Sequence, residues 1–209
     1  MKKTIFIILI TLAFTAGLNA QNKMDQAKQE TITFLKSLSA TVNADNYKMF
    51  GLKSPEDVSQ LEAGQVFASN LIQLDRLKKY EGGDAKSLIT NVNRASCTVI
   101  NRQTQQTVGI VDLELEKERY VVKGFASTDL ASALGRINKD LFKQNFSVVR
   151  IPALNTYFGS FTDAADNNLK FVSLQNSSEL RTEIGEIRPA EDFLKRLVPM
   201  ANEYNGLPW

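Results

Sequence analysis

The stretch from Thr107 to Leu141 limits the fold of this chain more strictly than any other part of it. Apolar and acidic residues alternate from Val111 to Glu116, which is typical of a strand with one buried and one solvated face. A polar turn at residues 116–119 follows, and the aromatic and β-branched residues of Tyr120–Phe125 favour a partner strand. Residues 127–141 then carry apolar side chains at helical spacing. We therefore predict a β-hairpin followed by a helix.

Further strands and helices are predicted on both sides of this hairpin. Ser127 or Thr128 can cap the central helix, and Ser54-Pro-Glu-Asp57 is a typical start of a short helix. Apolar stripes predict a first helix over residues 24–44 and a last helix over 189–204, the latter kinked or restarted at Pro199. Strands are predicted over residues 65–74, 95–100, 146–151, 154–161 and 169–174.

This order of elements predicts an α+β fold. We expect a curved, mainly antiparallel sheet packed against N-terminal, central and C-terminal helices. Residues 21–209 are expected to form a single domain, since no linker interrupts them. Two loosely similar halves, about residues 65–141 and 146–204, each place strands before a helix and suggest an internal duplication.

The first 20 residues are expected to be a signal peptide. Two lysines precede an apolar run from Ile5 to Phe14, and Leu18-Asn-Ala20 supplies a small residue at the cleavage point. About 20 apolar residues are needed to cross a bilayer, so the run is too short to serve as a comfortable membrane span. We therefore expect export to the periplasm, the cell surface or the medium, with no integral membrane segment after cleavage.

Charge and composition narrow the classes of function. The chain has 25 basic and 23 acidic residues, and the leader holds two of the lysines and no acid, so the mature chain is formally neutral. A neutral chain has no overall field to attract nucleic acid, which we exclude as a partner. Histidine is absent, which removes the common catalytic triads and most catalytic zinc sites. We expect no cofactor and favour a non-enzyme.

Several side chains invite a chemical role, and each has a structural alternative. Cys97, the only cysteine, lies among apolar residues and is interpreted as a small buried hydrophobe. The oxygen-rich segment Asp163–Asn168 lacks the spacing of a calcium loop and is interpreted as a turn. The acids at positions 112, 114, 116 and 118 could do acid–base work on a glycan, but a solvated sheet face explains them more simply.

The candidate ligand-binding residues are aromatic. Tyr157, Phe158 and Phe161 occur in one predicted strand and could line a sugar-binding face or belong to the core. Trp209 ends the chain and either packs on the body or remains available to a partner. If a site exists, we expect it where the sheet of Thr107–Leu141 meets the strand over residues 154–161.

Four segments carry a resemblance to a group of proteins. The chain resembles exported α+β proteins of Bacteroides-type bacteria, a group of unknown function, in the Asn-Ala-Gln end of its leader and in Leu71–Tyr80, Tyr120–Phe125 and Ile151–Phe158. The resemblance covers most of the mature chain and implies export and an α+β fold. Its motifs are packing patterns, so it transfers no active residue.

The leading hypothesis is an exported, non-catalytic module that binds a protein, a peptide or a glycan of unknown identity. One alternative is a carboxylate-dependent hydrolase of envelope polysaccharide, which needs two acids roughly 5 to 10 Å apart in one cleft. The other alternative is an inhibitor or chaperone-like partner of another exported protein.

Overall fold

The computed structural model describes residues 22–126 and 129–206. The first described element is a helix over residues 22–38, and two short 3₁₀ helices follow it, η1 at Tyr47–Phe50 and η2 at Pro55–Gln60. The Ser54-Pro-Glu-Asp57 signal does start η2, and the Asp57 carboxylate accepts a hydrogen bond of 2.9 Å from the backbone N–H of Ser54. The predicted caps Ser127 and Thr128 lie outside the described residues.

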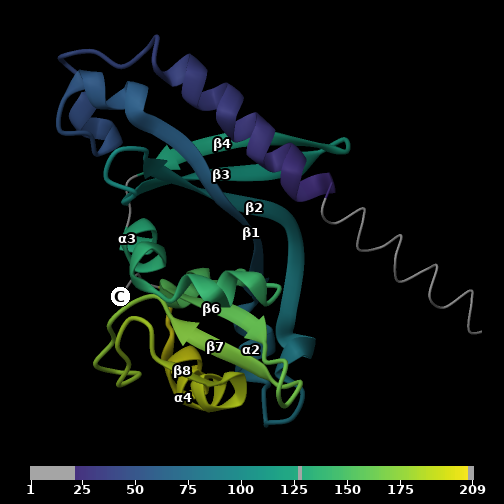
Figure 1. Ribbon diagram of the computed structural model, residues 1–209. Coiled ribbons are helices and arrows are strands. Elements are labelled where there is room, and N and C mark those ends of the chain that lie inside the picture. The colour runs from purple at the N-terminus through teal and green to yellow at the C-terminus, as the bar shows by residue number, and fades with distance from the viewer. Residues whose placement is uncertain (1–21, 127–128, 207–209) are drawn as a thin grey trace, which may run out of the picture.

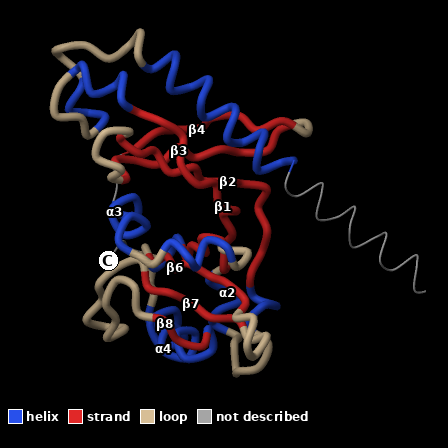
Figure 2. Tube along the Cα trace, in the orientation of Figure 1, coloured by secondary structure: helices blue, strands red, loops and turns tan. Residues whose placement is uncertain are grey.

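Eight strands form one mostly antiparallel sheet, which confirms the α+β class. Its order is β4-β3-β2-β1-β5-β6-β7-β8, and β1 and β5 form the one parallel pair (Figure 2). The strands are β1 Leu61–Ile72, β2 Ile89–Asn101, β3 Thr107–Glu116, β4 Arg119–Ala126, β5 Ser147–Ile151, β6 Thr156–Thr162, β7 Leu169–Ser173 and β8 Ile187–Pro189.

Helices pack on both faces of the sheet. In Figure 1 the helix of residues 22–38 lies across β3 and β4 at one end, and α2 (Leu74–Lys78) and α4 (Ala190–Glu203) lie at the other end. On β7, Phe171 packs in the core with α4 and the adjacent Val172 packs in the core with α3 (Asp129–Arg136). Successive strand residues point to opposite faces, so α3 and α4 cover opposite faces.

The hairpin and helix predicted for Thr107–Leu141 are confirmed. Glu116 pairs with Arg119 across the predicted turn, and α3 follows β4. The pair Ile110 and Val111, where the alternation fails, is buried on both faces: Ile110 packs with α3 and Val111 packs in the core of the helix of residues 22–38. The central helix is shorter than predicted, because a 3₁₀ helix, η4 (Lys139–Lys143), replaces its last turn.

Some predicted boundaries differ from the structure. Strand β2 begins at Ile89, earlier than predicted, because residues 89–94 pair with β1 despite their polar composition. Strand β8 was not predicted, since it has only three residues. Pro199 does not restart the last helix, and α4 runs through it.

The two halves of the chain share one order of elements. Strands β1 to β4 are followed by α3, and strands β5 to β8 are followed by α4. The halves meet at the parallel pair β1–β5, and their strands extend outward in opposite directions. Rotation by half a turn about an axis along the strands would exchange them and swap the faces, which agrees with α3 and α4 lying on opposite faces. In the part of the chain that the structure describes, no helix is long and apolar enough to span a membrane.

Candidate functional site

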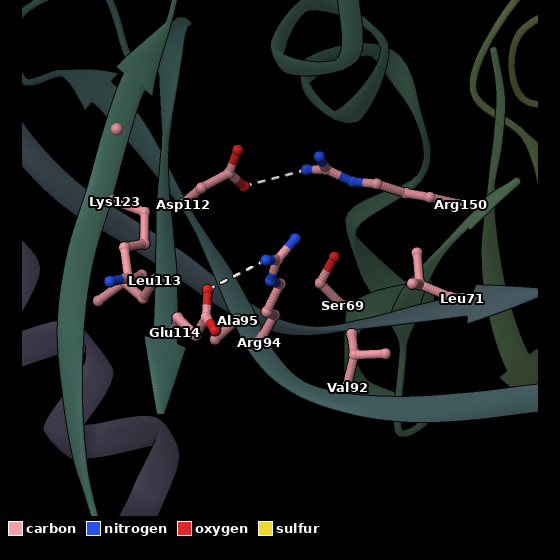
Figure 3. Close-up of a pocket in the computed structure, with 11 residues that line it drawn as sticks. Ser69, Leu71, Val92, Arg94, Ala95, Asp112, Leu113, Glu114, Lys123 and Arg150 are labelled. Carbon is pink, nitrogen blue, oxygen red and sulfur yellow. Dashed lines mark hydrogen bonds and ion pairs between the residues drawn. The ribbon is translucent and has the colours of Figure 1, made fainter. Parts of the chain in front are cut away.

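Polar side chains from five strands gather on the sheet face that carries α3. Two adjoining hollows open there, of about 200 and 710 Å³, and they share Leu71, Arg94, Asp112 and Arg150 in their linings. We call the combined space the cleft, and Figure 3 shows its smaller part. Its polar lining comprises Ser69, Arg94, Asp112, Glu114, Lys123, Asp129, Arg150, Asn155, Thr156, Tyr157 and Gln175.

Strand β3 supplies two carboxylates by its alternation. Asp112 and Glu114 point into the cleft, while their neighbours Val111 and Leu113 are buried in the core on the other face. On β2, Ser96 is the register partner of Asp112 and Arg94 is the register partner of Glu114. The acidic face of the hairpin therefore lies in a hollow and is not simply a solvated surface.

Arg150 connects the two halves of the sheet. It belongs to β5, yet its Nη2 donates to Asp112 Oδ1 on β3 at 3.0 Å and to Ser96 Oγ on β2 at 3.4 Å (Figure 3 shows the pair with Asp112). Ser96 Oγ also donates to Asp112 Oδ1, at 2.8 Å. One carboxylate oxygen thus accepts from both an arginine and a serine, and the three side chains form a small network.

The guanidinium of Arg150 is incompletely paired. Within residues 22–126 and 129–206, Nε of Arg150 is the one buried side-chain nitrogen or oxygen that has no hydrogen-bond partner. Leaving a buried donor unpaired costs about 1 to 3 kcal/mol, so such groups are rare in folded proteins. The side chain as a whole is 33% exposed, which leaves its outer part accessible from the cleft.

A second arginine–carboxylate pair lies beside the first. Arg94 Nη2 is 3.0 Å from Glu114 Oε2, and both side chains are more exposed than Arg150. Lys123 of β4 also borders the cleft, and its ammonium group pairs with Glu116. The lining holds three basic and three acidic residues, so its formal charge is zero: Arg94, Lys123, Arg150, Asp112, Glu114 and Asp129.

Tyr157 supplies the aromatic side chain of the cleft. It is the register partner of Arg150, and it lines the larger hollow near the start of α3. Burial and the nearby Asp129 carboxylate raise the pKa of Tyr157 and outweigh the opposite effect of Arg150, so its hydroxyl remains a hydrogen-bond donor.

The four candidate residues from the sequence have different positions. Tyr157 lines the cleft. Phe158 is fully buried on the other face, where its ring stacks on Phe171 at 5.4 Å, and Phe161 is buried in the core beneath α3. Trp209 lies outside the described residues. We retain Tyr157 for the site and assign Phe158 and Phe161 to the core.

The arginines of the cleft were not predicted. The available signal was Arg150, a charged residue within the apolar strand that ends at Ile151. Its partner Asp112 is 38 positions away in the sequence, and the contact depends on the pairing of β1 with β5. The predicted location does hold a cleft, because Ile110 and Asp112 of β3 line it together with Thr156 and Tyr157 of β6.

The other chemical candidates remain structural. Cys97 is fully buried, and burial raises the pKa of its thiol to about 11. The Asp163 carboxylate accepts from the backbone N–H of Ala165 at 3.0 Å, as in a turn. Among the residues that are described, no group of three or more acidic or cysteine side chains is arranged to hold a metal ion.

Comparisons with known proteins give no relative from which to transfer a function. No family model matches the chain, no curated protein matches it, and no solved structure matches its fold.

Proposed function

We propose that this protein is an exported, non-catalytic binding module that holds a polar ligand in the cleft. The observation that carries the proposal is Arg150, a half-buried arginine on an apolar strand that reaches Asp112 and leaves its Nε unpaired. A buried ion pair is often no more stable than well-packed apolar side chains. A role in binding explains why such a pair is present in a hollow.

The contact between Arg150 and Asp112 also supports a curved sheet. Strands β1 and β2 lie between β5 and β3, so β5 and β3 would be about 14 Å apart in a flat sheet. Their side chains nevertheless meet at 3.0 Å. Bending toward the face that carries α3 brings them within reach and forms the hollow.

We propose the periplasm or the cell surface as the location. The support is the charged and apolar leader of residues 1–20 and the formal neutrality of the remaining chain. The same features agree with the proposed resemblance to exported proteins of Bacteroides-type bacteria.

The test is a thermal-shift screen of the mature chain against peptide and glycan panels. Each hit is repeated with Arg150→Gln and with Arg102→Gln. Arg102 is the matched control because it also pairs with a carboxylate, Glu62 at 3.3 Å, but in a different hollow. We expect hits that Arg150→Gln removes and Arg102→Gln retains. Hits that persist in Arg150→Gln would argue against the cleft, and silence across both panels would argue against a binding module for these ligands.

A hydrolase is the second candidate, because Asp112 and Glu114 face the same cleft. A glycosidase acid must carry a proton to donate it, whereas each of these carboxylates is paired with a guanidinium. Turnover of a polysaccharide by the native chain, abolished in Asp112→Asn and Glu114→Gln, would favour the hydrolase over the binding module.

A further inference from the structure

We infer that the ligand of the cleft is a neutral glycan. This inference rests on the proposed function and specifies its ligand class. Its basis is the combination of a lining with zero formal charge, two arginine–carboxylate pairs that alternate donors with acceptors, and a single tyrosine beside them.

The ion pairs disfavour a charged ligand. A ligand carboxylate that took Arg150 from Asp112 would leave the Asp112 charge unpaired next to a second anion, and a ligand cation that took Asp112 would leave Arg150 unpaired. Removing one partner of such a pair is costly. A neutral ligand can bind to the outer atoms of both side chains and leave the 3.0 Å contact intact.

Sugar hydroxyls match the groups that are present. A hydroxyl donates one hydrogen bond and accepts up to two. Adjacent hydroxyls can therefore donate to Asp112 and accept from Arg150, and a second set can do the same at Glu114 and Arg94. The ring of Tyr157 supplies an apolar surface with a polar tip at one end of the row, which suits the C–H face of a sugar.

The position of the cleft disfavours an extended peptide. Peptides commonly bind by adding a strand to an exposed sheet edge, where backbone N–H and C=O groups are free. The cleft lies over β3, β2, β1 and β5, which are inner strands with partners on both sides. Recognition there must use side chains, and those available are hydrogen-bonding groups.

The experiment measures binding by calorimetry with short neutral oligosaccharides of glucose, mannose, galactose, xylose or N-acetylglucosamine. Uronic-acid oligosaccharides and short peptides are the comparison probes. The variants are Asp112→Asn, Arg150→Gln and Tyr157→Ala. The matched control is Arg119→Gln, which removes an ion pair with Glu30 outside the cleft. Circular dichroism confirms that each variant is folded.

We expect a neutral oligosaccharide to bind, with an affinity that falls about tenfold or more in each cleft variant, or about 1.4 kcal/mol. Arg119→Gln should bind as the native chain does. Salt should have little effect, because screening weakens interactions between charges and this ligand has none.

Other outcomes separate this inference from the proposed function. Binding of acidic oligosaccharides or peptides in the cleft, with no binding of neutral ones, overturns the glycan inference and leaves the binding module standing. Neutral binding that the three cleft variants do not weaken overturns the assignment to the cleft. No binding by any probe overturns the inference and also counts against the proposed function.

Discussion

Arg150 and Asp112 test whether a side-chain pair serves stability or binding. Both are partly exposed, at 33% and 50%, and ion pairs in such positions contribute about 0 to 1 kcal/mol to stability. We predict that Asp112→Asn changes the free energy of unfolding in urea by about 1 kcal/mol or less. A loss of several kcal/mol would show that the pair is a structural support of the sheet.

Cys97 gives a second prediction at the scale of one residue. Burial raises the pKa of its thiol from 9.0 to about 11, so the unfolded chain loses the proton at a lower pH than the native chain. The native state then binds more protons between these values, and stability falls as the pH rises from about 9 to 11, by up to about 3 kcal/mol.

Unfolding of the native chain and of Cys97→Ala across this pH range isolates the effect of the thiol. Tyrosines and lysines titrate in both proteins, so only the difference between the two curves reports on Cys97. We expect the native chain to lose more stability than the variant. Parallel curves would contradict the assignment, as would rapid labelling of the native thiol at neutral pH.

The hairpin between β3 and β4 carries a prediction at the scale of elements. Its two turn residues, Lys117 and Glu118, have positive φ values of 45° and 71°, which favour asparagine and glycine over long side chains. Replacing the pair with Asn-Gly should raise the free energy of unfolding by about 0.5 to 1 kcal/mol. Lys117→Val should lower it, since β-branched residues resist this conformation. The reverse order of the two variants would argue against the turn geometry.

Strand β6 packs too closely to accept a side chain at Gly159. A Cβ there would overlap the ring of Phe146 and lie 2.6 Å from Val172 Cγ1. We predict that Gly159→Ala lowers the free energy of unfolding by about 1 to 3 kcal/mol. Gly124→Ala on β4 is the control, because no atom lies within 4 Å of its Cβ. Equal effects of the two substitutions would contradict this packing.

Elements with a strong local pattern could be predicted from the sequence, and others could not. The hairpin of β3 and β4 was predictable because its alternation and its turn are local. The early part of β2 was not, since Asn91, Asn93 and Arg94 are poor strand formers that pairing with β1 holds in place. Strand β8 was not predicted either, because three residues give no period to detect.

At the scale of the whole molecule, the sequence predicted where the cleft lies but not which groups fill it. The neighbourhood follows from strands that could be recognised separately, β3 and β6. Arg94 and Arg150 could not be placed, because their positions depend on the parallel pairing of β1 with β5 and on the bend of the sheet. No local signal encodes either feature. Tyr157 was identified as a candidate because aromatic side chains are visible in the sequence.

The central claim is that the cleft is the ligand site of this protein. Nuclear magnetic resonance mapping tests it most directly: backbone amide shifts of the labelled mature chain are followed as a bound oligosaccharide is titrated. We predict that the largest changes fall around Arg94, Asp112, Arg150 and Tyr157 on the face that carries α3. Changes centred on the hollow between the helix of residues 22–38 and β1, near Arg102, with none in the cleft, would contradict the claim.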